Sequence, residues 1–231
     1  MISVLVPFRE PGDGHRTKLW DLIAASLHKS FAEVLVGTDD GLPFNKGKAV
    51  NAAASRASGG VYLITDADTW VSPELVGKAL DAITVGAAWS KPWNLKLKLD
   101  EQTTRDILAQ GPAWDGTLTP RQRKGLENLN TFVAAPPLLV TREAFDGVGG
   151  MDERIAGWGQ DDVTFARALR VLYGAPVMMR GTCIHLWHPR IGRSGRDLWD
   201  GQTSDAENRA IAAAYLRARR PEQMRELIAS R

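Results

Sequence analysis

Residues 61–68 read Val-Tyr-Leu-Ile-Thr-Asp-Ala-Asp, a short apolar run that ends in two carboxylates. The apolar run from Val61 to Thr65 follows a pair of glycines and predicts a buried strand. Acids at alternate positions after a strand can point together once the chain turns, and their oxygen atoms suit Mg²⁺ or Mn²⁺ beside a diphosphate. Because an isolated Asp-x-Asp pair is equally typical of a turn, the surrounding sequence has to decide between these interpretations.

Strands and helices alternate on both sides of this run. Two further strands are expected over Ile2 to Phe8 and Glu33 to Gly37, and helices over Lys18 to Phe31, Lys46 to Ala57 and from Pro73 onward. Ser72 before Pro73 is a typical helix start. Such a βαβαβα order predicts an α/β fold with a mostly parallel central sheet flanked by helices.

The second half of the chain is less regular. The expected elements are a strand over Pro137 to Thr141, a helix over Asp161 to Leu172, a strand over Ala175 to His188 and an amphipathic helix over Ser204 to Arg219. Residues 87–131, where three tryptophans lie among Pro, Gly and Lys, predict an irregular, mobile insertion. We expect one domain over 1–231, with a nucleotide-binding half (1–86), this insertion (87–131), an acceptor and metal half (132–200) and C-terminal helices (201–231).

The composition is that of an ordinary soluble globular protein. Apolar residues make up 44% and charged residues 24% of the 231 positions, and the formal net charge is +2. So small a charge does not indicate a nucleic-acid or anionic-membrane partner. The single cysteine, Cys183, has no partner for a disulfide within the chain, and no apolar run approaches the roughly 20 residues that span a bilayer. We therefore expect a cytoplasmic protein without membrane insertion.

Two histidines close the last expected strand. His185 and His188 are three residues apart, so both imidazoles can reach one metal ion if the strand gives way to a turn. A single histidine is more often structural, whereas a close pair at the end of a buried strand favours a metal site. Imidazole ligands combined with carboxylates shift the preference from Mg²⁺ toward Mn²⁺.

A glycine-rich segment precedes the helix expected from Asp161. Residues 157–162 read Gly-Trp-Gly-Gln-Asp-Asp. Acids at a helix start cap its amides and complement its dipole, which is a structural role. A functional carboxylate at such a place keeps a low pKa unless burial opposes it. Trp158, between two glycines, offers a flat apolar face to a sugar ring.

Basic residues follow the first strand and open the second helix. Arg9 suits a phosphate or a nucleotide base, although exposed arginines are common. Residues 44–51 read Phe-Asn-Lys-Gly-Lys-Ala-Val-Asn, and lysines with free amides at a helix start favour anions. Solvated surface lysines would give the same pattern. Asp39 and Asp40 suit a ribose or base edge, or a turn.

The order of these motifs resembles the β-1,4-galactosyltransferase family and the galactosyltransferase C-terminal domain, among GT-A glycosyltransferases that include family 2-like bacterial members. The matching segments are Pro-Phe-Arg at 7–9, Phe-Asn-Lys-x-Lys-x-x-Asn at 44–51, Asp-x-Asp at 66–68, Gly-Trp-Gly-x-Asp-Asp at 157–162 and the histidine pair at 185–188. Two positions depart from the family: Lys46 replaces an arginine, and Asp161 replaces a glutamate. The resemblance implies a single GT-A (Rossmann-like) domain.

The resemblance and the motifs together imply a role for each residue. Residues expected to bind the nucleotide are Pro7, Phe8, Arg9, Asp39, Phe44, Lys46, Lys48 and Asp66. Expected ligands of Mn²⁺ (or Mg²⁺) are Asp68, His185 and His188. Residues expected at the sugar and acceptor are Trp158, Gly159 and Asp161, and the implied general base is Asp162.

The implied activity is an inverting hexosyltransferase that moves a hexose or an N-acetylhexosamine from a UDP-sugar to an acceptor hydroxyl. A retaining glycosyltransferase of the same fold and a non-catalytic carbohydrate-binding relative are the alternatives. A sugar nucleotidyltransferase is disfavoured because the Gly-rich signature expected after the first strand is missing. The acceptor stays open among a glycan, a protein, a lipid-linked sugar, a small metabolite and a modified nucleobase.

Overall fold

A six-stranded sheet in the order β2-β1-β3-β8-β5-β9 organises the chain. The computed structural model describes residues 1–231 except 11, 13, 124–126, 131–133, 158 and 190–204. The strands are β1 (Ile2–Pro7), β2 (Glu33–Gly37), β3 (Val61–Ile64), β5 (Trp89–Lys91), β8 (Leu138–Thr141) and β9 (Val177–Met178). Only β8 runs against its neighbours, β3 and β5, while the other pairs are parallel. The prediction of a mostly parallel sheet is confirmed.

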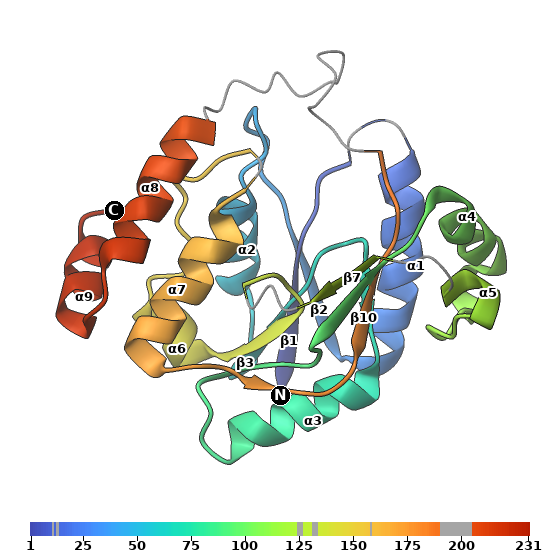
Figure 1. Cartoon of the computed structure of the whole chain (residues 1–231), viewed down its shortest axis with the longest axis horizontal. Helices are drawn as coiled ribbons and strands as arrows, with labels where there is room; N and C mark the ends of the chain where they lie inside the picture. The colour runs from blue at the N-terminus through green and yellow to red at the C-terminus, as the bar shows by residue number, and fades with distance from the viewer. Residues whose placement is uncertain (11, 13, 124–126, 131–133, 158, 190–204) are drawn as a thin grey trace.

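Alternating side chains of the central strands separate two layers of core. Val4 and Val6 of β1 pack with α1 (His15–Ser30) and α3 (Pro73–Thr84), whereas Leu5 between them packs on the other face. This alternation follows from the two-residue period of a strand. The second layer contains α2 (Lys46–Ala54), α6 (Arg142–Gly147), α7 (Asp161–Tyr173), α8 (Asp205–Arg217) and α9 (Pro221–Ala229). Figure 1 shows α1 and α7 on opposite sides of the sheet.

The start of α2 is fixed by close contacts with its surroundings. Asn45 caps the helix, since its Oδ1 accepts from the backbone N–H of Lys48 at 2.9 Å. Its Nδ2 donates to the carbonyl of Glu153 at 2.7 Å, which ties α2 to the segment before α7. The helix also crosses directly over the end of β2, because a Cβ added at Gly37 would lie 1.7 Å from the carbonyl oxygen of Ala49. Both contacts hold Lys46 in a defined place.

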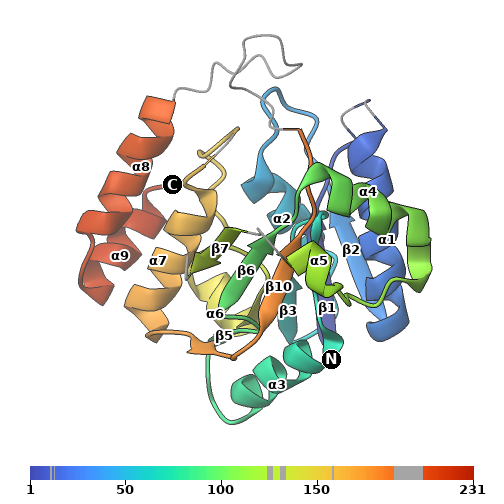
Figure 2. The ribbon, with the colours of Figure 1, turned by 45° about the vertical axis from the view of Figure 1, so that its right-hand side comes forward.

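A second, four-stranded sheet lies beside the first, in the order β4-β10-β6-β7. Its strands are β4 (Thr69–Val71), β6 (Leu95–Lys98), β7 (Glu127–Asn130) and β10 (Thr182–His185), and Figure 2 shows β6, β7 and β10 together. β10 pairs antiparallel with β4, so that His185 lies opposite Thr69. This pairing brings the end of β10 to the residues that follow β3.

The prediction of an irregular insertion over 87–131 is wrong for most of its described residues. The segment contains β5, β6, β7, α4 (Glu101–Gln110), a 3₁₀ turn η1 (Gly111–Ala113) and α5 (Pro120–Arg123). Trp89 and Trp93 are each only 1% exposed, and the indole of Trp93 donates to the carbonyl of Pro137 at 2.8 Å. Strands of three or four residues give little periodic signal, so pairing with distant strands specifies them.

The expected strand from Ala175 to His188 is in fact two strands in different sheets. β9 pairs with β5 of the first sheet, whereas β10 pairs with β4 and β6 of the second. Gly181 lies at the crossing, where its N–H donates to Oδ1 of Asn94 at 2.9 Å. An added Cβ at Gly181 would lie 2.5 Å from a methyl of Leu75. An apolar run that changes sheets cannot be distinguished from one long strand by composition.

The C-terminal part folds into helices, as expected. The predicted helix over Ser204 to Arg219 corresponds to α8, and α9 follows it. Tyr215 of α8 is buried and donates its hydroxyl to the carboxylate of Asp152 at 2.9 Å, which fixes α8 to the rest of the domain. None of the described helices has the length and apolarity needed to cross a bilayer.

Trp93→Ala is expected to lower the free energy of unfolding by about 3–5 kcal/mol, because it removes a large buried side chain and leaves a cavity. Urea unfolding of the variant and the wild type measures this difference. Leu216→Ala is the control, since Leu216 is 54% exposed and its loss should change stability by roughly 0.5 kcal/mol or less. Equal, small effects of both substitutions would mean that residues 87–99 are not part of the core.

Candidate active site

The motif residues gather at the carboxyl ends of the central strands. Arg9 follows β1, Asp39 follows β2, and Asp66 follows β3, while His185 ends β10 of the second sheet. In Figure 1 this edge lies opposite the marked N terminus. The carboxyl edge of an open α/β sheet is where such folds bind ligands.

Arg9, Asp39 and Phe44 form one structured loop. Nη1 of Arg9 donates to the carbonyls of Gly41 at 2.6 Å and Asp39 at 3.2 Å. Its guanidinium lies over the ring of Phe44, 5.3 Å from the centroid. Asp39 Oδ2 accepts from the backbone N–H of Asn45 at 3.0 Å. The structure thus brings these three predicted nucleotide-binding residues together, and their contact with a nucleotide stays a prediction.

Three other residues expected at the nucleotide have packing or solvent contacts. Pro7 is buried at the end of β1, opposite Gly37 of β2. The ring of Phe8 stacks on Trp20 with 5.8 Å between centroids. Lys48 has an exposed side chain, and its backbone N–H donates to the cap residue Asn45. A role of these three residues in nucleotide binding stays a prediction.

Lys46 lies among three carboxylates. Its Nζ is 2.8 Å from Oδ1 of Asp66 and 2.9 Å from Oδ1 of Asp162. Oδ2 of Asp161 is 3.6 Å away. The residues after β3 and the first turn of α7 are therefore joined by one ammonium group. A role of Lys46 as a phosphate ligand stays a prediction.

The pKa values within this cluster move in different directions. Burial opposes the charge of Lys46, but the three carboxylates outweigh it and raise the pKa of the ammonium group. Burial raises the pKa of Asp162 to about 7, with Asp161 and Asp66 acting in the same direction and Lys46 opposing them. Burial is the exception that the sequence analysis left open for a carboxylate at this helix start, and here it outweighs the helix dipole and the lysine.

Asp68, His185 and His188 form a compact set of metal-ligand atoms. Nε2 of His188 is 3.2 Å from Oδ2 of Asp68, and Nε2 of His185 is 3.6 Å from Oδ1. One ligand atom from each residue lies within 4.8 Å of the other two. The backbone N–H of Leu186 donates to the carbonyl of Asp68 at 2.9 Å, which fixes the two segments relative to each other.

The chemistry of this donor set fits a divalent metal such as Mn²⁺. Burial lowers the pKa of His185, which favours the neutral imidazole that binds metals. Burial disfavours the charge on Asp68, but the two histidines and Arg16 outweigh it and lower the pKa of the carboxyl. Nδ1 of His188 is 2.9 Å from the carbonyl of Pro189, and an N–H there would direct the Nε2 lone pair toward a metal.

Two basic residues beside the metal set were not expected from the sequence. Arg16 and His15 lie in the first turn of α1. The guanidinium of Arg16 is 3.1 Å from Nδ1 of His188, and Nε2 of His15 is 3.2 Å from the carbonyl of Trp187. Neither belongs to a motif with a recognisable spacing, because the contact spans 172 positions.

Lys91 is a further unexpected residue near the carboxylates. It is fully buried at the end of β5, and its Nζ lies 4.0 Å from the ring centroid of Trp93 and donates to the carbonyl of Ala135. Burial lowers the pKa of this amine to about 7, against the opposing charges of Asp162 and other groups. A single lysine in an irregular segment gives no signal in the sequence.

The loop before α7 depends on glycine. Trp158 lies outside the described residues, and its neighbours Gly157 and Gly159 have φ angles of 77° and 95°. Glycine reaches this left-handed region without steric cost. The N–H of Gly157 donates to the carbonyl of Phe44 at 3.0 Å, so this loop contacts the loop around Arg9. The motif glycines, Gly159 included, therefore set the path of the loop at the carboxyl edge.

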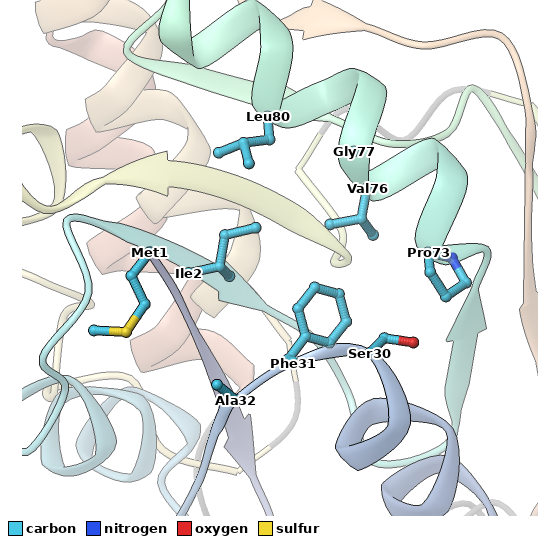
Figure 3. Close-up of a pocket in the computed structure, with 9 residues that line it drawn as sticks. All are labelled: Met1, Ile2, Ser30, Phe31, Ala32, Pro73, Val76, Gly77 and Leu80. Atoms are coloured by element: carbon cyan, nitrogen blue, oxygen red, sulfur yellow. The ribbon is translucent and has the colours of Figure 1, made fainter.

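An apolar pocket of about 360 Å³ lies away from these groups, at the amino ends of the strands. Figure 3 shows its lining, which is Met1, Ile2, Ser30, Phe31, Ala32, Pro73, Val76, Gly77 and Leu80. None of these lining residues carries a carboxylate or an imidazole. The groups suited to chemistry are therefore those at the carboxyl edge of the sheet.

No protein-family model matches this chain, and no curated protein matches it. Solved structures do resemble it. One is glucosyl-3-phosphoglycerate synthase from Mycobacterium tuberculosis in complex with Mn²⁺ and UDP-glucose, which is 14% identical over 95% of this chain and 78% of that chain, with a TM-score of 0.52. The same enzyme with Mn²⁺, UDP and phosphoglyceric acid gives 16% identity, the same coverages and a TM-score of 0.50.

The catalytic domain of Drosophila β1,4-galactosyltransferase 7 with xylobiose is also similar, at 20% identity and a TM-score of 0.43. The match covers 78% of this chain and 63% of that chain, so this protein spans less than two thirds of the length of that neighbour. At such identities a likeness shows the fold alone. The similarity to the synthase confirms the expected α/β fold of GT-A type.

Asp68→Asn is expected to weaken Mn²⁺ binding strongly, because the substitution removes the anionic ligand of the three. Titration of the protein with Mn²⁺, followed by the paramagnetic resonance of the free ion, measures the affinity. Asp81→Asn, on the exposed face of α3, is the matched control and should leave binding unchanged. Wild-type protein that binds no Mn²⁺ would refute the assignment of the metal set.

Asp162→Asn is expected to stabilise the fold at pH 8 but not at pH 4. The pKa of Asp162 is about 7 in the folded chain and ordinarily 3.8, so ionising this partly buried acid opposes folding as the pH rises between these values. Thermal unfolding of wild type and variant across this range tests the effect. Asp21→Asn, on an exposed part of α1, is the matched control. If the unfolding temperatures of wild type and Asp162→Asn changed in parallel with pH, the result would contradict the raised pKa of Asp162.

Proposed function

We propose that this chain is a metal-dependent, inverting glycosyltransferase that moves a hexose or an N-acetylhexosamine from a UDP-sugar to an acceptor hydroxyl. The observation that carries the proposal is the contact of Lys46 with both Asp66 and Asp162. Because Asp66 is two residues from Asp68, this contact links the partly buried carboxylate of Asp162, through Lys46, to the segment that contains Asp68. The shared fold with a synthase solved with Mn²⁺ and UDP-glucose supports a uridine diphosphate donor.

The donor would bind across the carboxyl edge of the sheet. Asp68, His185 and His188 would hold the metal, which when bound neutralises the charge that develops on the departing diphosphate. The loop of Arg9 and Phe44, with its cation–π contact, offers a flat cationic surface to the uracil base. Two arguments support these roles in donor binding: both groups lie at the carboxyl edge of the sheet, and their side chains have the charge and ligand atoms that a metal-bound nucleotide requires.

Asp162 would act as the general base. Its pKa of about 7 suits proton transfer at neutral pH, since a base works best when its pKa is near the working pH. It would accept the proton of the acceptor hydroxyl while the hydroxyl oxygen attacks the anomeric carbon from the face opposite the diphosphate. A single displacement of this kind inverts the anomeric centre, so a UDP-α-sugar would give a β-linked product.

Asp161 and the loop at 157–160 would contact the acceptor and the transferred sugar. Oδ2 of Asp161 is 3.6 Å from Nζ of Lys46, which places it beside Asp162 at the same helix start. We expect the acceptor to be a hydroxyl compound from the classes left open by the sequence: a glycan, a protein, a lipid-linked sugar, a small metabolite or a modified nucleobase. A cytoplasmic location likewise stays a prediction.

A panel of UDP-sugars tests the function, with Mn²⁺, Mg²⁺ or EDTA added. We expect donor turnover that requires metal and is lost in Asp68→Ala together with donor binding. Asp162→Asn should still bind the donor but lower kcat by roughly 10²–10⁴-fold, because it removes general base catalysis. Asp81→Asn should behave as wild type. Absence of nucleotide-sugar binding with every metal would favour a carbohydrate-binding protein, and a product that retains the anomeric configuration would exclude the inverting mechanism.

A further inference from the structure

Lys96 of β6 lies on the same face of the second sheet as His185 of the metal set. In the parallel pairing of β6 with β10, which Figure 2 shows side by side, Lys96 lies opposite Cys183. His185 follows Cys183 by two residues on β10. Side chains two residues apart on a strand project from one face of the sheet. Lys96 therefore projects from the face that carries the metal set.

The ammonium group of Lys96 has no acid of its own. Lys96 is only 9% exposed, although lysine is among the residues that are rarely buried. Within the described ranges of the chain, its Nζ forms no ion pair and no hydrogen bond. A buried charge without a counter-ion is unfavourable. An anionic ligand would supply the counter-ion that the fold leaves out.

The charge of Lys96 acts on two other groups of the candidate site. Burial opposes the charge of Asp66, but Lys46 and then Lys96 contribute to lowering the pKa of that carboxyl. Burial lowers the pKa of His185, with Asp68 opposing this effect and Lys96 adding to it. Lys96 thus lies close to both the segment after β3 and the metal set, without an ion pair to either.

The metal set alone does not balance a diphosphate. Asp68 supplies one carboxylate and the two histidines supply neutral ligands, so a bound divalent ion leaves a net charge of one at the set. The diphosphate of a nucleotide sugar carries more negative charge than this. A cationic side chain on the same face would complete the balance and stabilise the departing diphosphate.

The geometry points to Lys96 as a residue that binds the diphosphate of the donor beside the metal. This inference rests on the proposed function. A lysine binds phosphate as a point charge on a flexible stem. The anion would relieve two unfavourable features at once: the unpaired charge of Lys96, and the repulsion between that charge and a divalent ion at the metal set.

This repulsion gives Lys96→Met a distinctive pattern of effects. Without nucleotide, the variant should bind Mn²⁺ as tightly as wild type or more tightly, because a neighbouring positive charge is removed. At saturating Mn²⁺, its affinity for UDP should fall roughly 10- to 100-fold, the range for loss of a hydrogen bond between charged groups. Uridine affinity should stay unchanged. Calorimetry with Mn²⁺, UDP and uridine measures all three affinities.

Two further variants complete the experiment. Lys96→Arg keeps the positive charge and should restore part of the UDP affinity. Lys78→Met, on the exposed face of α3, is the matched control and should bind Mn²⁺, UDP and uridine as wild type does. Lys96→Gln provides the same comparison if methionine disturbs β6.

The outcomes separate this inference from the proposed function. Weakened UDP binding with unchanged or tighter Mn²⁺ binding supports the role of Lys96. Losses of Mn²⁺ and UDP affinity of equal size would overturn it, because Lys96 would then only support the fold around the metal set. Equal losses for UDP and uridine would also overturn it. Unchanged UDP affinity would overturn it and leave the proposed function intact, whereas wild type that binds no UDP would overturn both.

Discussion

The candidate site depends on one ammonium group placed among three carboxylates. Asp66, Asp161 and Asp162 approach one another at the carboxyl edge of the sheet, where like charges would repel without Nζ of Lys46 between them. Lys46 is held there because Asn45 caps α2 and is tied to Glu153, and because α2 packs directly on Gly37. The contact joins residues 116 positions apart and so couples the two halves of the domain.

The second sheet positions the residues of the metal set, as the contacts of α2 position Lys46. The antiparallel pairing of β10 with β4 places His185 opposite Thr69, directly after Asp68. A carboxylate and two imidazoles then meet without any long flexible loop between them. Of the three, His185 lies on a strand, while Asp68 directly precedes β4 and His188 follows β10 by three residues, so the pairing of these two strands sets the positions of the set. The metal set and the lysine cluster are linked through the short segment that contains Asp66 and Asp68.

The two groups of residues divide the work of the proposed reaction. Lys46 serves Asp162 and its neighbours, and its charge opposes the rise in the pKa of the base. Arg16 contacts His188 of the metal set. The single ammonium group of Lys46 contacts all three carboxylates at once.

The sequence by itself determined the alternating strands and helices and the positions of the motif acids and histidines at strand ends. The carboxyl ends of parallel strands lie at one edge of the sheet. Residues that follow a strand, such as Asp66 and Asp68, therefore lie at that edge whatever the order of the strands in the sheet. Only the tertiary structure decided the burial of Trp89 and Trp93, the change of sheet at Gly181, the pKa of Asp162 and the partners of Lys46 and Arg16. These features arise where segments far apart in the sequence pack against each other. Local periodicity and motif spacing contain no information about which distant segments come into contact.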